Sequence, residues 1–315
     1  MNWKLTTGKL IKAWQDYPKQ RQRIAWVPTG KPILVTGTHR SGTTWFASML
    51  AASGIWYIHE PFSPLKQRWK EWLSYQSPKY PSPEVDRLMT SVLNNQFPES
   101  VHIANTDHPL MPLRLFPSPS QRIMIKDPLA CLMTEYLTKN FDLETLILFR
   151  HPCGFVASIR RLGWPCGAPL KRFLQNSDLM ADHLHPYQDL LEKYCDEDTI
   201  YSATVLYGAL TTVLWDCVQK KIGKPLFFEQ LCQNPLDEFA KIFEDLNLPY
   251  DDQVKKRHQH LCYGELQAIE NYHPHAVARN SLAMAYTWKD QLEERQINQI
   301  KNIWNNFGIS LYVDQ

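Results

Sequence analysis

Five short apolar segments alternate with longer helical patterns, and this alternation constrains the fold more than any other feature of the sequence. The segments are rich in β-branched and aromatic residues and lie at 33–36, 56–58, 122–126, 145–149 and 225–229. After the first of them, Thr43 to Ala52 has the pattern of a helix that ends near Gly54. Apolar strands separated by helices predict a mainly parallel sheet with helices on both faces. We therefore expect a doubly wound α/β domain of about five core strands, with its ligands at the carboxyl ends of the strands.

Two long segments interrupt the alternation of strands and helices. Residues 62–120 are rich in proline, serine and aromatic residues, and residues 162–220 have a mainly helical pattern. We expect these insertions to cover the site as a cap that shapes the substrate pocket, with ordinary packing layers as the alternative. The expected organisation is a basic N-terminal segment, 1–31, followed by one domain, 32–315.

Composition excludes several classes of function. The 34 lysines and arginines nearly balance the 32 aspartates and glutamates, which argues against a general nucleic-acid binder but permits a local anion pocket. The seven cysteines include no CxxC pair, so reduced thiols are expected. No run of 18 apolar residues predicts a membrane span. The basic N-terminal segment has no apolar core typical of a signal peptide, so we expect a cytoplasmic protein, with peripheral contact to an anionic membrane as a secondary interpretation.

A glycine-containing loop follows the first strand and opens the next helix. It reads Gly37-Thr38-His39-Arg40-Ser41-Gly42-Thr43-Thr44-Trp45. Its two glycines let the backbone wrap closely around an anion, and the free N–H groups at the helix start point at that anion. A nucleotide-triphosphate loop has a lysine after its second glycine, whereas this loop has Thr43 there and its cation inside, at Arg40. The pattern suits a donor whose single 5′-phosphate carries a different leaving group.

A second anion-binding pattern follows the strand at 145–149. Arg150 comes directly after that strand, Pro152 and Gly154 form a turn, and Ser158 lies in the early turns of a helix. A guanidinium and a hydroxyl together are well suited to bind a phosphate monoester. Either residue alone is better explained as an ordinary ion-pair arginine or helix serine. Together with the glycine loop at the same sheet edge, they predict phosphate binding.

These segments resemble the motifs of the sulfotransferases that use 3′-phosphoadenosine-5′-phosphosulfate (PAPS). The glycine loop resembles their 5′-phosphosulfate loop, and Arg150 with Ser158 resembles their 3′-phosphate motif, including the spacing. The segments at 227–235 and 279–308 are similar to later parts of the family, and the likeness runs from about residue 32 to 310 in the family's order. Arg40 replaces the loop lysine usual in the cytosolic branch, as in the carbohydrate-type and protein-tyrosine enzymes. The late RKGxxG motif is absent.

The resemblance implies a P-loop-type fold, conversion of PAPS to adenosine-3′,5′-bisphosphate (PAP), and catalysis that requires no metal. In this chain the implied donor site consists of His39, Arg40, Ser41, Gly42, Thr43, Thr44, Trp45, Arg150, Ser158 and Arg279. Arg40 is expected to stabilise the charge that develops on the bridging oxygen. Glu60, after the second strand, resembles the carboxylate base of the carbohydrate-type and tyrosyl enzymes, with a buried structural carboxylate as the alternative.

Other residues are weaker candidates for the general base. Asp127 is the reserve candidate, and His102 and His108 follow it. His59 precedes Glu60 in the strand pattern and is expected on the opposite face, because side chains alternate along a strand. Three His-x-His pairs occur, but none is joined to a third ligand at a familiar spacing, so no metal site is expected; they are His183/His185, His258/His260 and His273/His275.

The favoured hypothesis is sulfuryl transfer to a hydroxyl or amine of an acceptor, with a glycan or glycolipid preferred because of Arg40 and Glu60. A small-molecule secondary metabolite is the alternative acceptor. Two other functions compete with this hypothesis. A P-loop kinase or NTPase would need a lysine after Gly42 and an acidic Mg²⁺ ligand, for which Glu229 is only a loose candidate. A glycan-binding module would use the aromatic residues of 62–120 and would not respond to a nucleotide.

Overall fold

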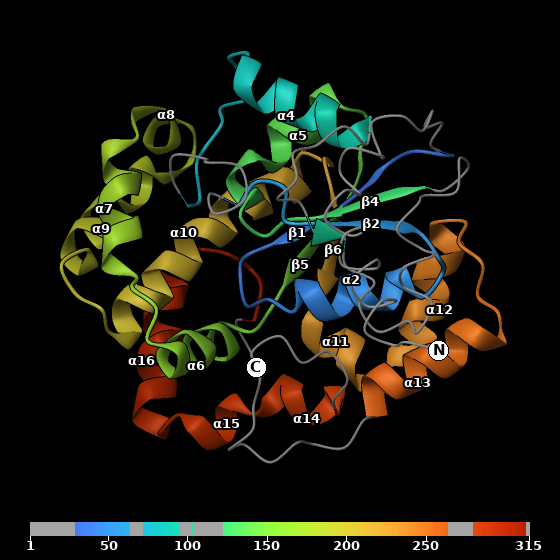
Figure 1. Cartoon of the computed structure of the whole chain (residues 1–315). Coiled ribbons are helices and arrows are strands. Elements are labelled where there is room, and N and C mark those ends of the chain that lie inside the picture. Colours follow the sequence, from blue (N-terminus) through green and yellow to red (C-terminus); the bar gives the residue numbers. More distant parts are fainter. Residues whose placement is uncertain (1–28, 64–71, 95–101, 104–121, 264–279, 313–315) are drawn as a thin grey trace, which may run out of the picture.

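A mainly parallel sheet forms the centre of the molecule (Figure 1). The computed structural model describes residues 29–63, 72–94, 102–103, 122–263 and 280–312, with only the backbone described at 102–103. Within these ranges the strand order is β3-β2-β4-β1-β5-β6. The strands are β1 (Ile33–Gly37), β2 (Trp56–His59), β3 (His102–Ile103), β4 (Ile123–Lys126), β5 (Glu144–Phe149) and β6 (Lys224–Phe227). Strands β2, β4, β1, β5 and β6 pair in parallel, which confirms the predicted fold class, and β3 pairs antiparallel with β2.

Helices follow most of the strands and fill the second insertion. From β1 to β5 they are α2 (Thr43–Ala51), α4 (Pro83–Leu93) and α5 (Thr134–Asn140). From β5 to β6 they are α6 (Pro152–Leu162), α7 (Gly167–Gln175), α8 (Ser177–Leu179), α9 (Gln188–Tyr194) and α10 (Ile200–Gln219). After β6 they are α11 (Phe228–Gln233), α12 (Pro235–Asp245), α13 (Asp252–Tyr263), α14 (Ser281–Tyr286), α15 (Trp288–Gln291) and α16 (Glu294–Asn305).

The two faces of the sheet bury different sets of side chains. On one face, Ile33, Val35 and Leu148 pack with buried residues of α2, α12 and α13. On the other face, Leu34 joins a cluster with α4 and α5, and Phe149 joins a cluster with α6, α10 and α16. Alternation of inward-facing residues along each strand therefore covers the sheet on both sides. Packing on both faces holds the carboxyl ends of β1 and β5 in fixed positions.

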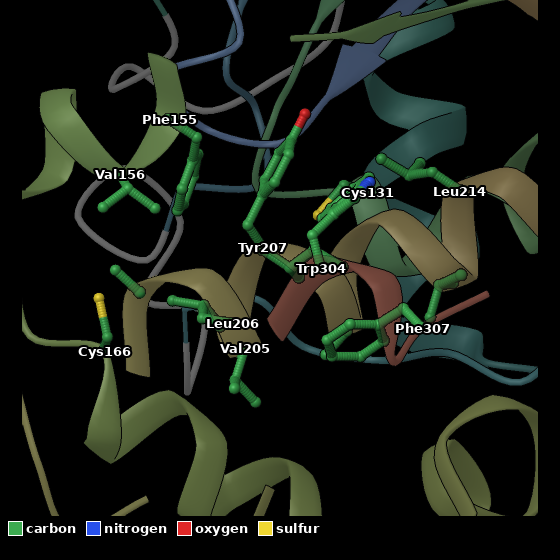
Figure 2. Close-up of a cluster of buried hydrophobic side chains, with 14 of the residues drawn as sticks. Cys131, Phe155, Val156, Cys166, Val205, Leu206, Tyr207, Leu214, Trp304 and Phe307 are labelled. Carbon is green, nitrogen blue, oxygen red and sulfur yellow. The ribbon is translucent and has the colours of Figure 1, made fainter. Parts of the chain in front are cut away.

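The long helix α10 is held by aromatic packing behind the sheet edge. Tyr207 stacks on Phe155 of α6 with ring centroids 4.5 Å apart and on Trp304 of α16 at 5.4 Å. Figure 2 shows these rings within one buried cluster that also contains Phe307. Phe307 lies against Gly208, where a Cβ would come within 2.1 Å of the phenylalanine ring. The absence of a side chain at Gly208 thus allows the C-terminal segment to approach α10 closely.

The structure refines several sequence predictions. The fifth core strand ends at Phe227 rather than at Glu229, because Phe228 and Glu229 already belong to α11. The short strand β3 was not predicted. The helical character expected for 162–220 is confirmed by α7 to α10. Within the described part of 62–120, the structure contains α4 and β3. None of the helices described here has the length and apolar character needed to cross a membrane.

Candidate active site

Two loops at the carboxyl ends of neighbouring strands form the walls of one cavity. Gly37 at the end of β1 pairs in register with Leu148 near the end of β5. The loop from Gly37 to Gly42 and the turn at Arg150 therefore leave the sheet side by side, as expected for parallel strands. The cavity between them has a volume of about 970 Å³, including its open mouth. The two sequence patterns that we assigned to anion binding thus open onto the same space.

The glycine loop presents the amino terminus of α2 to this cavity. Gly42 is the N-cap residue of α2, with φ of 95°. As a glycine it has no side chain that could accept a hydrogen bond from the first N–H groups of the helix. A side chain at Gly42 would lie 2.5 Å from the ring of Phe228, so glycine is required both by the backbone and by this contact. Thr43 and Thr44 line the cavity beside it. The first N–H groups of α2 and the two threonines together form a site suited to an anion.

Three further residues of the loop occupy different positions. His39 and Trp45 line the cavity. Burial and the neighbouring Arg40 lower the pKa of His39 to about 4, so its imidazole is neutral at physiological pH. The Ser41 hydroxyl instead donates to the Thr38 carbonyl at 2.6 Å. Ser41 thus stabilises the loop, and it is not among the described residues that line the cavity.

Arg40 connects the first loop to helix α6. Its backbone has φ of 66°, a left-handed conformation that is uncommon for a residue with a side chain. Its Nε donates to the Ser158 hydroxyl at 3.0 Å, and its guanidinium lies 5.9 Å from the ring centroid of Trp164. Both Arg40 and Ser158 line the cavity. The structure therefore brings together the cation of one pattern and the hydroxyl of the other.

Arg150 is fixed by contacts on both its backbone and its side chain. Its N–H donates to the Tyr207 hydroxyl at 3.0 Å, and that hydroxyl donates to the Arg150 carbonyl. Its Nη1 donates to the Arg40 carbonyl at 2.8 Å, and its guanidinium lies 4.9 Å from the ring centroid of Phe228. Gly154 leaves room for it, because a Cβ there would be 2.8 Å from Nε of Arg150. Arg150 is therefore a preorganised cation at the cavity wall.

Glu60 lines the same cavity and pairs with a buried lysine. Lys126 Nζ donates to Glu60 Oε1 at 2.5 Å, and the lysine side chain is only 1% exposed. Burial lowers the pKa of Lys126, while the Glu60 carboxylate acts in the opposite direction. Both residues line the cavity. Sequence reasoning missed Lys126 as a site residue, although its position at the end of a core strand was a usable signal.

His59 is absent from the described lining of the cavity, whereas its neighbour Glu60 belongs to it. His59 Nε2 lies 3.5 Å from Glu60 Oε1, and the other ring nitrogen lies 2.9 Å from the Tyr57 hydroxyl. Glu60 has φ of 49°, so the extended backbone of β2 ends at His59 and the glutamate lies in the turn that follows. The pattern of alternation applies only while the backbone stays extended.

The weaker candidates for the general base are Asp127, His102 and His108. Asp127 is fully buried and accepts hydrogen bonds from the backbone of Phe62 at 2.6 Å and Leu129 at 2.9 Å, so it braces the turns after β2 and β4. Burial, and then Glu60, raises the pKa of Asp127 to about 7. His102 contributes its backbone to β3. His108 and Arg279 lie outside the described residues.

The cavity has a strongly cationic lining. Four cationic side chains and one carboxylate line it within the described parts of the chain; the cations are Arg40, Lys126, Arg150 and Arg161. Arg161, one turn beyond Ser158, and Gln291 of α15 were not predicted. Glu229 serves a different purpose, since it accepts from the His151 N–H at 2.9 Å and from Tyr312 at 2.9 Å. Across residues 29–63, 72–94, 122–263 and 280–312, no three His, Cys, Asp or Glu side chains are grouped to hold a metal ion.

Comparison with known proteins gives likenesses among solved structures only. No protein-family model matches the sequence, and no curated protein matches it. The sulfotransferase domain from the curacin biosynthetic pathway is 13% identical, with a TM-score of 0.44 and coverage of 88% of this chain and 98% of that chain. The sulfotransferase domain from the Synechococcus PCC 7002 olefin synthase is 16% identical, with a TM-score of 0.47 and coverage of 91% and 96%. A mouse sulfotransferase complexed with PAP is 11% identical, with a TM-score of 0.43 and coverage of 95% and 91%.

All three TM-scores are below 0.5, so the function has to be inferred from the chemistry of the site.

The contact between Gly154 and Arg150 predicts an effect of Gly154→Ala on anion binding. The added methyl group displaces the guanidinium, so we expect the affinity for PAP to fall about tenfold or more. Alanine gains roughly 0.5–1 kcal/mol over glycine in a helix, but the displaced guanidinium loses its hydrogen bond to the Arg40 carbonyl, so we expect the free energy of unfolding to change by no more than about 1 kcal/mol. Calorimetric titration with PAP and urea denaturation of the free protein measure the two effects. If the free energy of unfolding fell by as much as the binding free energy of PAP, the substitution would be acting through the fold instead.

Proposed function

We propose that this protein is a sulfotransferase that moves a sulfuryl group from PAPS to a hydroxyl or amine of an acceptor and releases PAP. The observation that carries the proposal is the meeting of two anion sites in one cavity, with Arg40 bonded directly to Ser158. The amino terminus of α2 suits a 5′-phosphate. Arg150, Ser158 and Arg161 suit a second phosphate group. An adenosine nucleotide with phosphates at both ends of the ribose satisfies both sites.

In the proposed transfer step, Arg40 and Lys126 are the cations that assist the reaction. The bond between sulfur and the bridging oxygen of the donor breaks, and a bond from sulfur to the acceptor oxygen or nitrogen forms. Negative charge develops on the bridging oxygen as its bond to sulfur breaks, and fixed cations stabilise that charge without reorganisation. Arg40 lies in the loop that would hold the phosphate, and Lys126 lies at the end of the neighbouring strand β4. Together they could provide the stabilisation that a kinase obtains from Mg²⁺.

Glu60 is the proposed general base. It lines the cavity with its side chain 24% exposed, so an acceptor can reach it, whereas Asp127 is buried and bonded to backbone N–H groups. The ammonium group of Lys126 favours the ionised form of the Glu60 carboxylate. In the proposed step, Glu60 takes the proton that the acceptor loses when its bond to sulfur forms.

The composition of the donor site favours this function over a P-loop kinase or NTPase. A kinase loop carries a lysine after its second glycine, and here that position is Thr43. Among the described residues that line the cavity, Glu60 is the one carboxylate, and Lys126 already engages it. Glu229, the loose candidate for an Mg²⁺ ligand, is bonded to His151 and Tyr312. A glycan-binding module would not need the four cationic side chains that line this cavity.

The decisive test compares two nucleotides by thermal denaturation. At about a hundredfold excess over its dissociation constant, PAP should stabilise the protein by about 2.7 kcal/mol. For a domain of about 300 residues, that corresponds to a rise in the melting temperature of roughly 4–5 °C. Mg-ATP at the same concentration should have a much smaller effect, because the ribose of ATP carries no 3′-phosphate that Arg150 and Ser158 could bind. A larger shift with Mg-ATP than with PAP would refute the sulfotransferase proposal in favour of a kinase.

The proposed role of Arg40 predicts a loss of turnover in Arg40→Ala. Removing a cation from the bridging oxygen should lower kcat by about a hundredfold or more, since one preorganised donor contributes that much in other transfer reactions. Arg40→Lys is the matched variant and should retain more activity than Arg40→Ala, because it keeps the positive charge. It should remain below wild type, because it loses the Nε hydrogen bond to Ser158. Turnover of the alanine variant is measured as PAP release. Near-normal turnover would remove Arg40 from the mechanism.

The proposed role of Glu60 predicts a changed pH–rate profile in Glu60→Gln. The amide keeps an oxygen that can accept from Lys126 but cannot take a proton, so we expect kcat to fall about 10²–10⁴-fold. The wild-type rate should fall at low pH as the carboxylate is protonated, and this acidic limb should be absent in the variant. Thermal shift with PAP serves as the control for donor binding. Full activity with an unchanged profile would exclude Glu60 as the base.

A further inference from the structure

A second cavity lies beside the proposed donor site and differs from it in chemistry. Its volume is about 820 Å³ with its open mouth included. The walls are mainly apolar and include Trp72, Leu73, Leu129, Trp164 and Leu206. Leu73, Leu129 and Leu206 are buried, whereas the two tryptophans are 44% and 45% exposed. Two half-exposed indoles facing one hollow form an apolar surface that a ligand could cover.

Three contacts place this second cavity next to the reacting end of the first. His39 lines both cavities. Pro128 lines the first cavity, and its neighbour Leu129 lines the second. The guanidinium of Arg40 lies 5.9 Å from the ring centroid of Trp164. A molecule in the second cavity would therefore have one end close to the residues that we propose for transfer.

The insertion at 162–220 supplies one wall of the second cavity. Trp164 follows the end of α6 at Gly163, and Leu206 lies on α10, with Arg172 of α7 nearby in the lining. Trp72 and Leu73, which belong to the first insertion, complete the lining, and the Arg172 guanidinium donates to the Trp72 carbonyl at 3.5 Å. The two interruptions of the strand–helix alternation thus meet around one hollow.

The lining offers few partners for a polyhydroxylated ligand. Of its described residues, only His39 and Arg172 have side chains with strong hydrogen-bonding groups besides the indoles, and none is a carboxylate or amide. A sugar ring in this hollow would exchange water for apolar contacts at several hydroxyl groups, which is unfavourable without compensating bonds. An apolar body would instead gain from burial against the tryptophans and leucines.

We propose that the acceptor is an apolar molecule with a terminal hydroxyl group, its hydrocarbon body held in the cavity lined by Trp72 and Trp164 and its hydroxyl directed towards Glu60. This inference rests on the proposed sulfotransferase function and narrows its acceptor class. It departs from the glycan that the resemblance at Arg40 and Glu60 favoured. In this proposal the cationic cavity binds the donor, and the adjacent apolar cavity binds the acceptor.

The test uses the full chain with PAPS and a series of primary alcohols, hexanol, octanol and decanol, together with maltohexaose. Wild-type kcat/KM should rise about fourfold for each added methylene group until the cavity is filled, as expected for burial of hydrocarbon. Transfer to maltohexaose should be much slower than transfer to octanol. Release of PAP is measured for each acceptor.

Two variants and one control connect this selectivity to the cavity. Trp72→Ala and Trp164→Ala should each weaken the dependence of kcat/KM on chain length and raise KM for octanol about tenfold or more. A merely structural role of either tryptophan would lower activity with all alcohols alike and leave that dependence unchanged. Tyr80→Ala removes an aromatic ring that is 57% exposed but lies outside the cavity lining, and it should behave as wild type.

Thermal shift with PAP separates failure of this inference from failure of the proposed function. A normal PAP shift with transfer to maltohexaose in preference to the alcohols would overturn the apolar acceptor and leave the sulfotransferase proposal standing. A normal PAP shift with transfer to none of these acceptors would also overturn it. Absence of a PAP shift in the wild type would refute the proposed function, and the acceptor inference with it.

Discussion

The tether between Arg150 and the loop at Arg40 is the interaction on which the geometry of the candidate site depends. The Arg150 side chain donates to the Arg40 carbonyl, and Arg40 donates through Nε to Ser158 on the helix that follows Arg150. Each of the two sheet loops therefore restrains the other. Tyr207 holds the Arg150 backbone through both its N–H and its carbonyl, and it is itself stacked between Phe155 and Trp304. The cationic wall is thus connected to the buried core, which favours a preorganised anion site over one assembled by the ligand.

Backbone conformation distinguishes the two residues that we propose for chemistry. Arg40 and Glu60 both have positive φ, which costs free energy in residues with side chains and persists only when surrounding contacts enforce it. At Arg40 the enforcing contacts are those with Arg150 and Ser158. At Glu60 they are the N–H bond to the Lys126 carbonyl and the side-chain pair with the same lysine. Breaking the pair by removing one partner would leave a charge at a buried position, so the pair has to be considered as a unit.

The sequence predicted the sheet and the two anion patterns because these depend on local rules. Apolar runs identified the five parallel strands, and the glycines with Arg40, Arg150 and Ser158 identified the loops at their ends. The remaining parts depend on contacts between distant segments. The turn at Glu60 brings its carboxylate within 3.5 Å of the His59 ring, and no local pattern signals that turn. The bonds of Tyr207 to Arg150 span 57 positions, and Lys126 becomes a site residue only through the register of β4 with β1 and β2.

The same distinction between local and distant contacts explains why the acceptor is harder to infer than the donor. A phosphate-binding loop needs particular residues at fixed spacing, because backbone N–H groups and a helix terminus do most of the binding. An apolar cavity can be built from many combinations of side chains, since hydrophobic contact is not directional. Here its walls come from segments as far apart as Trp72, Trp164 and Leu206, which only the tertiary structure brings together. The class of donor can therefore be inferred from the sequence of the loop at Arg40. The class of acceptor can be inferred only from the shape and lining of the cavity that the two insertions form together.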